Sequence, residues 1–464
     1  MGVIITGVSS GSGKTTFAIG LMRALKNRGY RVAAFKSGPD YIDPMFHRLA
    51  VRGNSYNLPM WMLEDETIHG LYQKRSNNVD ISVVEGVMGY FDGHDVTSLH
   101  GSTAHLAKTI HTPVIVVLDA SSMSLTSAAM VQGLVDFDKP SMIKGVIFNH
   151  IKSEHHFELL KRAIQLHTQV KCYGYLKPNK EIILESRHLG LVQASEVDYL
   201  EEKIENMAKW VSDTVDVEAI FEDFNNAKSG VEGVSEVLKN FRTDLDICEQ
   251  PLHIGIAKDD AFSFYYDENI SLLNEIGINL VPFSPMRDMA LPEGLDGLYI
   301  GGGYPELYAD VLEANASMRS SVLAFASKGK PIYAECGGLM YLMSTLVSLD
   351  GKTYNMTGVF QGNALMTESL QRFGHVEAEL DCTKYSKSDK LSSVAMPSKI
   401  VYRGHEFHHS KIEGCDAEQL ISIRKNQRNW TCGYSVHRVL ATYVHNHFYS
   451  NLDFVKFLIS FYKG

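Results

Sequence analysis

Short runs of Val and Ile alternate with longer stretches of helical periodicity along the first third of the chain. The apolar runs cover residues 3–6, 32–36, 81–85, 114–119 and 145–149, and each is about as long as one strand. Short strands with apolar residues on both faces are typical of parallel sheets that helices cover on both sides. The pattern therefore predicts βαβ units and an α/β fold.

A second α/β pattern begins after a polar, charged segment without strong periodicity. Its predicted strands cover residues 253–257, 297–300 and 331–334, and a helix-like segment at 199–228 precedes the polar one. We place a linker at 229–250, which predicts one domain over residues 1–228 and a second over 251–464. The length of 464 residues allows two or three domains, because domains average roughly 150 residues.

Composition argues against several classes of protein. The chain has 44 Lys and Arg against 54 Asp and Glu, a net charge of -10, which does not suit a general nucleic-acid binder. No apolar run approaches the ~18 residues of a membrane span, and the N-terminus lacks the basic segment of a signal peptide. The six cysteines occur singly, without metal-site or disulfide spacing. We expect a cytoplasmic protein with no membrane or nucleic-acid partner.

The first predicted strand leads directly into a glycine-rich loop, GVSSGSGKTT at residues 7–16, which then begins a helix. Glycines let backbone N–H groups approach phosphates, and a helix N-terminus adds positive potential. Lys14 is expected to reach the β- and γ-phosphates of a nucleotide, and the Thr15 hydroxyl to bind Mg²⁺. The loop is one residue longer than the standard phosphate-binding loop. The predicted nucleotide site comprises Gly11, Ser12, Gly13, Lys14, Thr15 and Thr16.

Carboxylates follow the next two predicted strands. Asp40 and Asp43 come just after the second strand, and Glu85 and Asp92 lie at and beyond the end of the third. The carboxyl ends of parallel strands meet at one crevice, and Mg²⁺ prefers oxygen ligands. A single Asp here would more often form a turn. Several acids at neighbouring strand ends favour a site for a nucleotide and its metal.

One cysteine follows the predicted strand 331–334 within the segment AECGG at 334–338. The two glycines are expected to begin a helix, so the sulfur of Cys336 would lie at a helix N-terminus, which favours the thiolate. The N–H of Gly337 and one from residues 301–303, assigned to Gly303, would form an oxyanion hole. Candidate bases are His445 and His447. The alternative is an inert buried thiol.

These segments together resemble the cobyrinic acid a,c-diamide synthase family. The resemblance runs over essentially the whole chain and is carried by GPDYIDP (38–44), EGVMG (85–89), RHLGL (187–191), AECGG (334–338) and RGHEFH (403–408). The N-terminal half is similar to dethiobiotin synthetase-type ligases, which use the lengthened phosphate loop. The C-terminal half resembles a class I, triad-type glutamine amidotransferase with a flavodoxin-like fold.

The resemblance implies roles for individual residues. Cys336 would be the nucleophile of a glutaminase, and His445 the histidine that activates it. Many class I amidotransferases carry a glutamate two residues after that histidine, where this chain has His447, so the third triad member stays open. The remaining implied roles are ATP–Mg²⁺ binding by Lys14 and Thr15, metal ligation by Asp43 and Glu85, adenine contact by Asn149, and positioning of substrate or intermediate by Asp40, Tyr41 and Asp92.

The function implied by the resemblance is amidation of the a and c carboxylates of cobyrinic acid in cobalamin biosynthesis. The expected reactants are ATP, L-glutamine and a corrin or other tetrapyrrole carboxylic acid, with Mg²⁺ as cofactor. A homodimer is compatible with the motifs but not required by them. The motifs do not separate cobyrinate from nickel-sirohydrochlorin.

Two further interpretations remain open from the sequence. A partitioning-type nucleotide-switch ATPase would share the phosphate loop, but Ser9 stands where that group has an extra lysine, and a switch has no use for the cysteine site. The segment HEFHH at 405–409 resembles a metal site in composition, but its spacing is not His-Glu-x-x-His. We predict a strand there and assign no metal to it.

Overall fold

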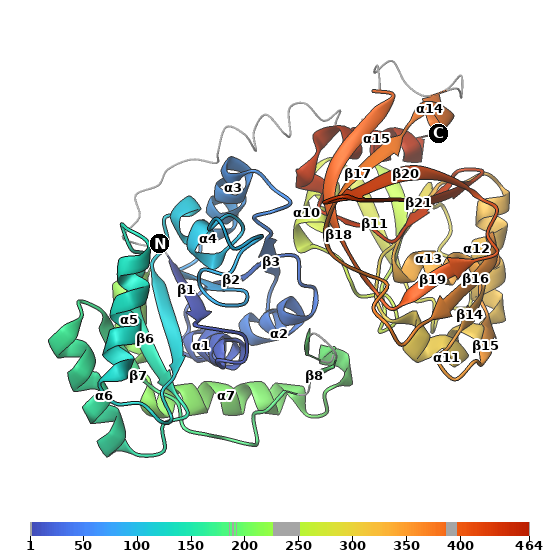
Figure 1. The fold of residues 1–464 in the computed structure, drawn as a ribbon. Helices are drawn as coiled ribbons and strands as arrows, with labels where there is room; N and C mark the ends of the chain where they lie inside the picture. Colours follow the sequence, from blue (N-terminus) through green and yellow to red (C-terminus); the bar gives the residue numbers. More distant parts are fainter. Residues whose placement is uncertain are drawn as a thin grey trace. The chain divides into compact units, whose positions relative to one another are not determined.

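The computed structural model describes residues 2–184, 186–187, 190–191, 193–225, 251–386 and 397–463. The chain divides into two compact units, Met1–Lys239 and Asn240–Gly464, coloured from blue to green and from yellow-green to red in Figure 1. The predicted linker at 229–250 lies outside the described residues.

The N-terminal unit is built on a seven-stranded sheet in the order β3-β2-β4-β1-β5-β6-β7. Every neighbouring pair of its strands is parallel. The strands are β1 (Gly2–Gly7), β2 (Val32–Ser37), β3 (Ser55–Leu58), β4 (Ile81–Glu85), β5 (Val114–Asp119), β6 (Ile143–Asn149) and β7 (Lys171–Tyr175). All residues of β1, β2 and β4 are buried, so both faces of the sheet are covered. This confirms the predicted parallel architecture; β3 and β7 were not predicted.

The helices of this unit connect the strands in the expected βαβ manner (Figure 1). They are α1 (Lys14–Asn27), α2 (Ile42–Val51), α3 (Asp65–Ser76), α4 (Thr103–Thr109), α5 (Thr126–Phe137), α6 (Glu154–His167), α7 (Leu200–Thr214) and α8 (Val217–Phe224). Between α6 and α7 lie β7, the short strands β8 (Ser186–Arg187) and β9 (Gly190–Leu191) and the turn η1 (Ala194–Glu196).

The helix-like segment predicted at 199–228 is two helices, not one. Val215 has extended dihedrals and ends α7, and the side chain of Asp216 then accepts a hydrogen bond from the N–H of Ala219 at 2.9 Å. An aspartate that caps the next helix interrupts the periodicity. Residues 226–228 lie outside the described residues.

Arg23 on α1 is fully buried and ties α1 to α2 and α7. Its guanidinium donates to Glu201 at 2.7 Å and to the carbonyl oxygen of Ala50 at 2.9 Å. Arg23→Ala removes these bonds and leaves the buried carbonyl oxygen of Ala50 without its donor, so it is expected to lower the free energy of unfolding by about 2–4 kcal/mol. Urea unfolding followed by circular dichroism measures the change.

The matched control for Arg23 is Arg52→Ala. Arg52 also donates to Glu201, at 3.1 Å, but its side chain is 60% exposed. Water can replace an exposed ion pair, so this variant is expected to lose less than about 1 kcal/mol. Equal losses in the two variants would contradict the structural role assigned to Arg23.

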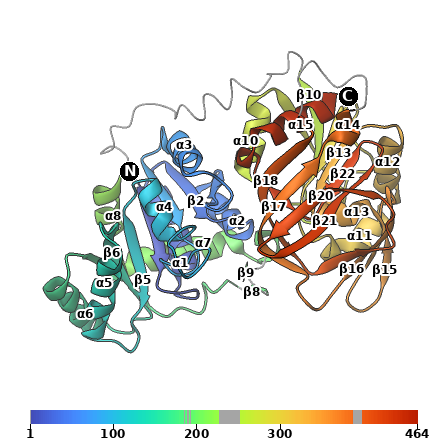
Figure 2. The same cartoon turned by 45° about the horizontal axis from the view of Figure 1, so that its top comes forward.

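The C-terminal unit contains a ten-stranded sheet in the order β11-β10-β12-β13-β22-β21-β20-β17-β18-β23. Pairs from β11 to β22 are parallel, and the remaining pairs are antiparallel. The strands are β10 (Leu252–Ala257), β11 (Ile278–Phe283), β12 (Gly297–Ile300), β13 (Ile332–Glu335), β17 (Arg372–Asp381), β18 (Lys399–His408), β20 (Glu418–Lys425), β21 (Arg428–Val436), β22 (Val439–Thr442) and β23 (His445–Asn446). Figure 2 shows β17, β18, β20 and β21 side by side.

A smaller sheet has the order β15-β14-β16-β19. Its strands are β14 (Met343–Val347), β15 (Thr353–Asn355), β16 (Phe360–Met366) and β19 (Ser410–Glu413). The helices of the unit are α10 (Asp267–Glu275), α11 (Ala309–Ala314), α12 (Ala316–Ser327), α13 (Gly337–Leu342), α14 (Thr383–Ser386) and α15 (Leu452–Lys463), with the turns η3 (Pro305–Tyr308) and η4 (Phe448–Ser450). No helix in the described ranges has both the length and the apolar character needed to span a membrane.

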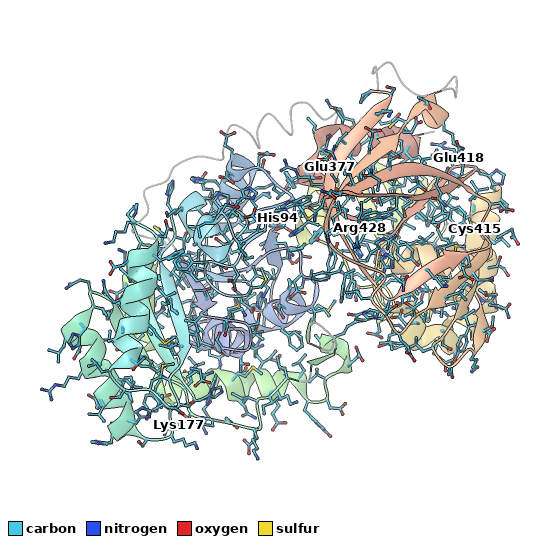
Figure 3. The ribbon with its side chains drawn as sticks, viewed as in Figure 1. His94, Lys177, Glu377, Cys415, Glu418 and Arg428 are labelled. Atoms are coloured by element: carbon cyan, nitrogen blue, oxygen red, sulfur yellow. The ribbon has the colours of Figure 1, made fainter. Side chains whose placement is uncertain are left out.

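The three parallel strands predicted for this unit are confirmed as β10, β12 and β13, with ends shifted by at most one residue. Residues 405–408 belong to strand β18, as predicted for the His-rich segment. Apart from this segment, the antiparallel strands of the sheet were not predicted, and neither was the parallel strand β11. The five cysteines within the described ranges form no disulfide; one of them, Cys415, is labelled in Figure 3.

Candidate active site

The predicted phosphate loop lies between β1 and α1, as the sequence indicates. Gly13 begins α1 with a φ of 90°, and an added Cβ would clash with the Nδ2 of Asn149, so only glycine fits. Asn149 ends β6 and donates from Nδ2 to the carbonyl oxygen of Ser12 at 2.9 Å, while its Oδ1 accepts the N–H of His150 at 2.8 Å. The side-chain amide of Asn149 therefore holds the phosphate loop in place through its hydrogen bond to Ser12. The contact of Asn149 with adenine stays a prediction.

The three predicted metal ligands come together beside this loop. Strands β2 and β4 pair so that Lys36 lies opposite Glu85. The Thr15 hydroxyl donates a short hydrogen bond to Oε1 of Glu85. The Nζ of Lys36 donates to the same oxygen at 3.0 Å and also to Asp43. Thr15, Asp43 and Glu85 thus form one connected polar cluster.

Sequence reasoning missed two members of this cluster, Lys36 and His47. The Nε2 of His47 lies 2.7 Å from Oε2 of Glu85, and both side chains are fully buried. The Lys36 side chain is only 4% exposed. A lysine at a strand end is usually solvated, and its burial here follows from strand pairing that the sequence does not display.

The cluster determines the ionisation of its members. Burial opposes ionisation of Glu85, but the charge of Lys36 and the bond from His47 outweigh it and hold the pKa of Glu85 below its usual value. Burial and then the charge of Lys36 lower the pKa of Lys14. Burial and then the charge of Asp43 raise the pKa of Asp40 well above its usual value. The site therefore pairs an ionised Glu85 with an Asp40 that protonates readily.

The donor set of this cluster fits Mg²⁺. A threonine hydroxyl and two carboxylates are hard oxygen donors, and a bound nucleotide contributes further phosphate oxygens. Lys36 contacts both carboxylates, so its positive charge balances the negative charge that would attract a metal cation. Among the described residues, no group of three or more His, Cys, Asp and Glu side chains is arranged to hold a metal.

The structure places Asp40, Tyr41 and Asp92 at two turns. Oδ1 of Asp40 accepts the N–H of Ile42 at 2.8 Å, at the start of α2, and Tyr41 is buried next to it. Oδ2 of Asp92 accepts the N–H of Gly89 at 2.9 Å and closes the turn after β4. Both aspartates have local structural roles, and their contact with a substrate stays a prediction.

Cys336 lies at the sharp turn between β13 and α13, as predicted. Its backbone dihedrals are φ 48° and ψ −104°, a region that L-residues rarely occupy. The side chain is buried, and the N–H of Cys336 donates to the carbonyl oxygen of Thr442 on β22 at 2.7 Å. This strained turn fixes the sulfur at the end of the parallel sheet, as in a nucleophile elbow.

The two glycines predicted for the oxyanion hole lie against each other. An added Cβ at Gly337 would lie 3.1 Å from the backbone N of Gly303. Gly303 has a φ of 152°, and an added Cβ there would clash with the carbonyl oxygen of Ala261. Close backbone packing therefore requires glycine at 303 and brings its N–H next to the turn that holds Cys336.

His445 follows β22 and lies near the same turn. Its Nδ1 is 3.5 Å from Oε2 of Glu335, the residue before Cys336. Its Cε1 lies 2.5 Å from where a Cβ at Gly302 would be, and the His405 ring stacks on it with centroids 4.9 Å apart. The structure thus places His445 next to Glu335, which precedes Cys336, and next to Gly302, which precedes Gly303 of the predicted oxyanion hole. Sequence reasoning missed Glu335 and His405.

Burial, followed by the charge of Glu306, raises the pKa of the Cys336 thiol, although a hydrogen bond from the N–H of Gly337 acts in the opposite direction. The expected stabilisation of the thiolate by the helix N-terminus is therefore outweighed, because α13 is short and the sulfur is desolvated. The thiol is protonated at neutral pH, so its attack on a substrate requires a base.

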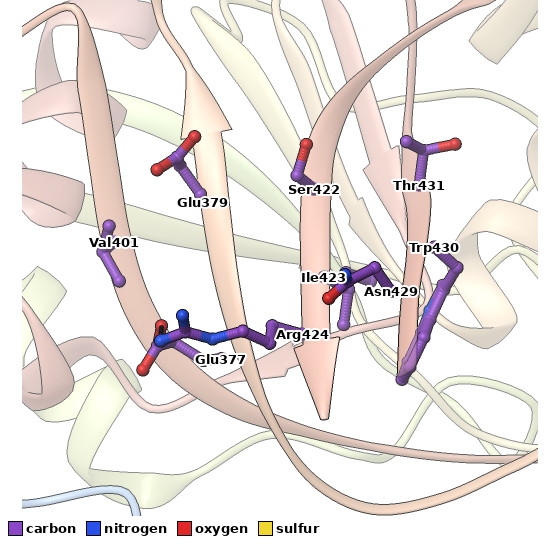
Figure 4. Close-up of a pocket in the computed structure, with 9 residues that line it drawn as sticks. All are labelled: Glu377, Glu379, Val401, Ser422, Ile423, Arg424, Asn429, Trp430 and Thr431. Atoms are coloured by element: carbon purple, nitrogen blue, oxygen red, sulfur yellow. Dashed lines mark hydrogen bonds and ion pairs between the residues drawn. The ribbon is translucent and has the colours of Figure 1, made fainter. Parts of the chain in front are cut away.

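Two surface pockets of this unit lie on its antiparallel strands. One of about 430 Å³ lies on the antiparallel strands β17, β18, β20 and β21, where Arg424 and Glu377 form an ion pair (Figure 4). A second, of about 640 Å³, is lined by the β20–β21 hairpin and by Arg372, Glu406 and Trp430. Neither pocket is lined by Cys336 or His445.

Comparison with known protein families gives a function class to each unit. Residues 3–192 match the CobQ/CobB/MinD/ParA nucleotide binding domain, and residues 253–452 match the CobB/CobQ-like glutamine amidotransferase domain. The chain is therefore a glutamine amidotransferase fused to a nucleotide-binding domain of the phosphate-loop type.

Three curated relatives, each named cobyrinate a,c-diamide synthase, match nearly the whole chain. The protein of Caldanaerobacter subterraneus subsp. tengcongensis is 40% identical over 98% of this chain and 96% of its own. That of Listeria innocua is 41% identical over 97% and 96%, and that of Streptococcus sanguinis 40% over 98% and 98%. The chain belongs to the cobyrinate a,c-diamide synthase family, as its motifs predicted.

Proposed function

We propose that this protein uses ATP and glutamine to amidate the a and c side-chain carboxylates of cobyrinic acid, a step of cobalamin biosynthesis. One observation carries the proposal: a single chain holds Lys14 in a phosphate loop and, in its other unit, Cys336 at a strained turn near His445. Relatives of matching length that are named cobyrinate a,c-diamide synthase support it.

A carboxylate must be activated before an amine can replace one of its oxygens, because oxide is a very poor leaving group. A carboxylate oxygen of the substrate would attack the γ-phosphorus of ATP, ADP would leave, and an acyl phosphate would form. Lys14, at the start of α1, would stabilise the charge that develops on the transferred phosphoryl group. Mg²⁺ held by Thr15, Asp43 and Glu85 would neutralise phosphate charge when bound.

The glutaminase unit would supply the nitrogen. The sulfur of Cys336 attacks the side-chain amide carbon of glutamine while His445 accepts the thiol proton. His445 then donates that proton to the departing nitrogen, ammonia leaves, and a thioester remains. Water, deprotonated by His445, hydrolyses the thioester to glutamate. The N–H groups of Gly303 and Gly337 would bind the oxyanion in both steps.

Ammonia then attacks the carbonyl carbon of the acyl phosphate, phosphate leaves, and a proton is lost to give the amide. Two rounds complete the a and c positions. Ammonia in bulk water near neutral pH is mostly protonated and unreactive, so we expect a shielded route between the two centres. We expect the reaction to take place in the cytoplasm, with no membrane or nucleic-acid partner, in a monomer or a homodimer.

Mass spectrometry of the products tests the proposal. The purified protein is incubated with ATP, Mg²⁺ and glutamine, and with cobyrinic acid or nickel-sirohydrochlorin in parallel. The expected result is the diamide of cobyrinic acid, with one glutamate released for each amide formed. Preferential conversion of nickel-sirohydrochlorin would assign that substrate instead. ATP hydrolysis without glutamate release would favour a nucleotide switch and refute the synthase function.

A further inference from the structure

The position where class I amidotransferases resembling this chain carry a glutamate holds His447 here. His447 is fully buried, and its Nε2 lies 3.9 Å from Oε2 of Glu268. Burial lowers the pKa of His447 to about 3, so its imidazole is neutral at physiological pH. A neutral ring does not stabilise a positive charge on His445 in the way a carboxylate does. The glutaminase therefore needs its carboxylate from elsewhere.

We propose that Glu335 positions His445 for glutamine hydrolysis, which rests on the glutaminase function proposed above. Oε2 of Glu335 lies 3.5 Å from Nδ1 of His445, and the two side chains are 1% and 3% exposed. Sites without substrate often show catalytic hydrogen bonds that are long and tighten when the substrate binds. A carboxylate at Nδ1 holds the proton on that nitrogen and leaves Nε2 to accept the proton of the thiol.

Strand pairing explains why a residue so distant in sequence reaches His445. Glu335 is the last residue of β13 and pairs with Thr442, the last residue of β22. The chain reaches His445 three residues later and pairs it with His405 on β18. Glu335 also immediately precedes Cys336, so one strand end sets the positions of both the carboxylate and the sulfur. A register shift of β13 would move both groups together relative to His445.

A neighbouring phenol, that of Tyr333, fixes the carboxylate of Glu335 in place. The Tyr333 hydroxyl donates to Oε1 of Glu335 at 2.8 Å, which leaves Oε2 for His445. Burial raises the pKa of both Tyr333 and Tyr299 well above the usual value, and the charge of Glu335 raises them further. These phenols therefore remain protonated, and that of Tyr333 is the donor that orients Glu335.

His405 restrains the other side of the His445 ring. The two rings stack at an interplanar angle of 23°, and Nδ1 of His405 lies 3.2 Å from the hydroxyl oxygen of Tyr266. Burial lowers the pKa of His405 well below its usual value, and the charge of His445 lowers it further. A neutral ring therefore packs on one face of His445, while Glu335 contacts its edge.

The test is Glu335→Gln, which preserves size and an oxygen near Tyr333 but removes the charge. Glutamate release from glutamine is measured at steady state. We expect kcat to fall by on the order of 10²-fold or more while KM for glutamine changes by less than about threefold. Glu335→Asp restores the charge at a greater distance from His445. Its kcat is expected to be about tenfold higher than that of Glu335→Gln. A purely structural role would not produce this rescue.

The matched control is Glu268→Gln, the same change at a fully buried carboxylate that lies near His447. It is expected to keep kcat within about threefold of the unmodified protein. Tyr333→Phe, which removes only the hydroxyl that orients Glu335, is expected to lower kcat by about three- to tenfold. Tyr333→Phe leaves the charge in place and reports on the same contact if Glu335→Gln fails to fold.

Three outcomes would overturn the proposal: kcat of Glu335→Gln within threefold of the unmodified protein, equal losses in Glu335→Gln and Glu268→Gln, or a change confined to KM. If Glu335→Gln does not fold, unchanged kcat in Tyr333→Phe would overturn it as well. If the proposed function itself is wrong, the unmodified protein releases no glutamate from glutamine. That result differs from all the outcomes above, which compare variants of an active protein.

Discussion

Cys336→Ala is expected to abolish glutamine-dependent amidation and to leave ammonia-dependent amidation intact at raised pH. In the proposed mechanism the sulfur at the β13–α13 turn forms and breaks the bond to the glutamine carbon, and no other described cysteine shares that turn. Glutamate release should fall by at least about 10⁴-fold, as is usual when a nucleophile is removed. Raised pH supplies un-ionised ammonia from solution and bypasses the missing step.

The matched control for this variant is Cys382→Ala. Cys382 is also buried, at the end of β17, and its pKa is likewise raised by burial, to about 12. It is expected to change neither activity. Glutamate release and diamide formation are measured side by side, with glutamine or ammonium chloride as the nitrogen source. Loss of ammonia-dependent synthesis in folded Cys336→Ala would contradict the proposal that glutamine hydrolysis and amidation are separable half-reactions.

Lys14→Ala is expected to abolish amidation with either nitrogen source while the uncoupled release of glutamate persists. Lys14 is buried at the start of α1, and the charges of Glu85 at the end of β4 and of Asp43 in the first turn of α2 act on it. Removing this cation withdraws the charge that stabilises the transferred phosphoryl group. Acyl phosphate formation should fall by on the order of 10²- to 10³-fold.

Lys26→Ala is the matched control, since Lys26 lies in the last turn of the same helix. It is expected to retain synthesis within about twofold of the unmodified protein. Phosphate release with cobyrinic acid and ammonia as substrates is the direct measurement. If Lys14→Ala keeps more than about a tenth of this rate, the phosphate loop does not serve the ligase step and the first unit has another role.

Parallel strands such as β1, β4, β12 and β13 could be predicted from the sequence because they are buried along their whole length and are mostly apolar, whereas β3, β7 and β11 were missed. The helix-like segment predicted at 199–228 is confirmed as helical over 200–214 and 217–224, and Asp216 divides it into two helices. Among the strands from β14 to β21, only the end of β18, at residues 405–408, was predicted. In β17, for example, buried Val376, Ala378 and Leu380 alternate with polar residues, a pattern typical of a half-buried strand, so β17 was missed although the sequence displays it.

The candidate site was predictable only where its residues lie close together in sequence. The loop before Lys14 and the turn at Cys336 are each contiguous, so their form could be inferred directly. The partners Lys36 and Glu335 act through strand pairing across the sheets, with Lys36 opposite Glu85 and Glu335 opposite Thr442. Nothing in the local sequence around either residue indicates which side chain it meets.

The backbone at position 336 also has a consequence for evolution and engineering. Its dihedrals of 48° and −104° suit glycine and are unfavourable for any residue with a side chain. Holding cysteine there costs on the order of 1–3 kcal/mol of folding free energy. Selection for thermal stability alone would therefore favour glycine at position 336, and the more stable protein would be catalytically inactive. Screens for heat-tolerant forms should retain a demand for glutamine hydrolysis.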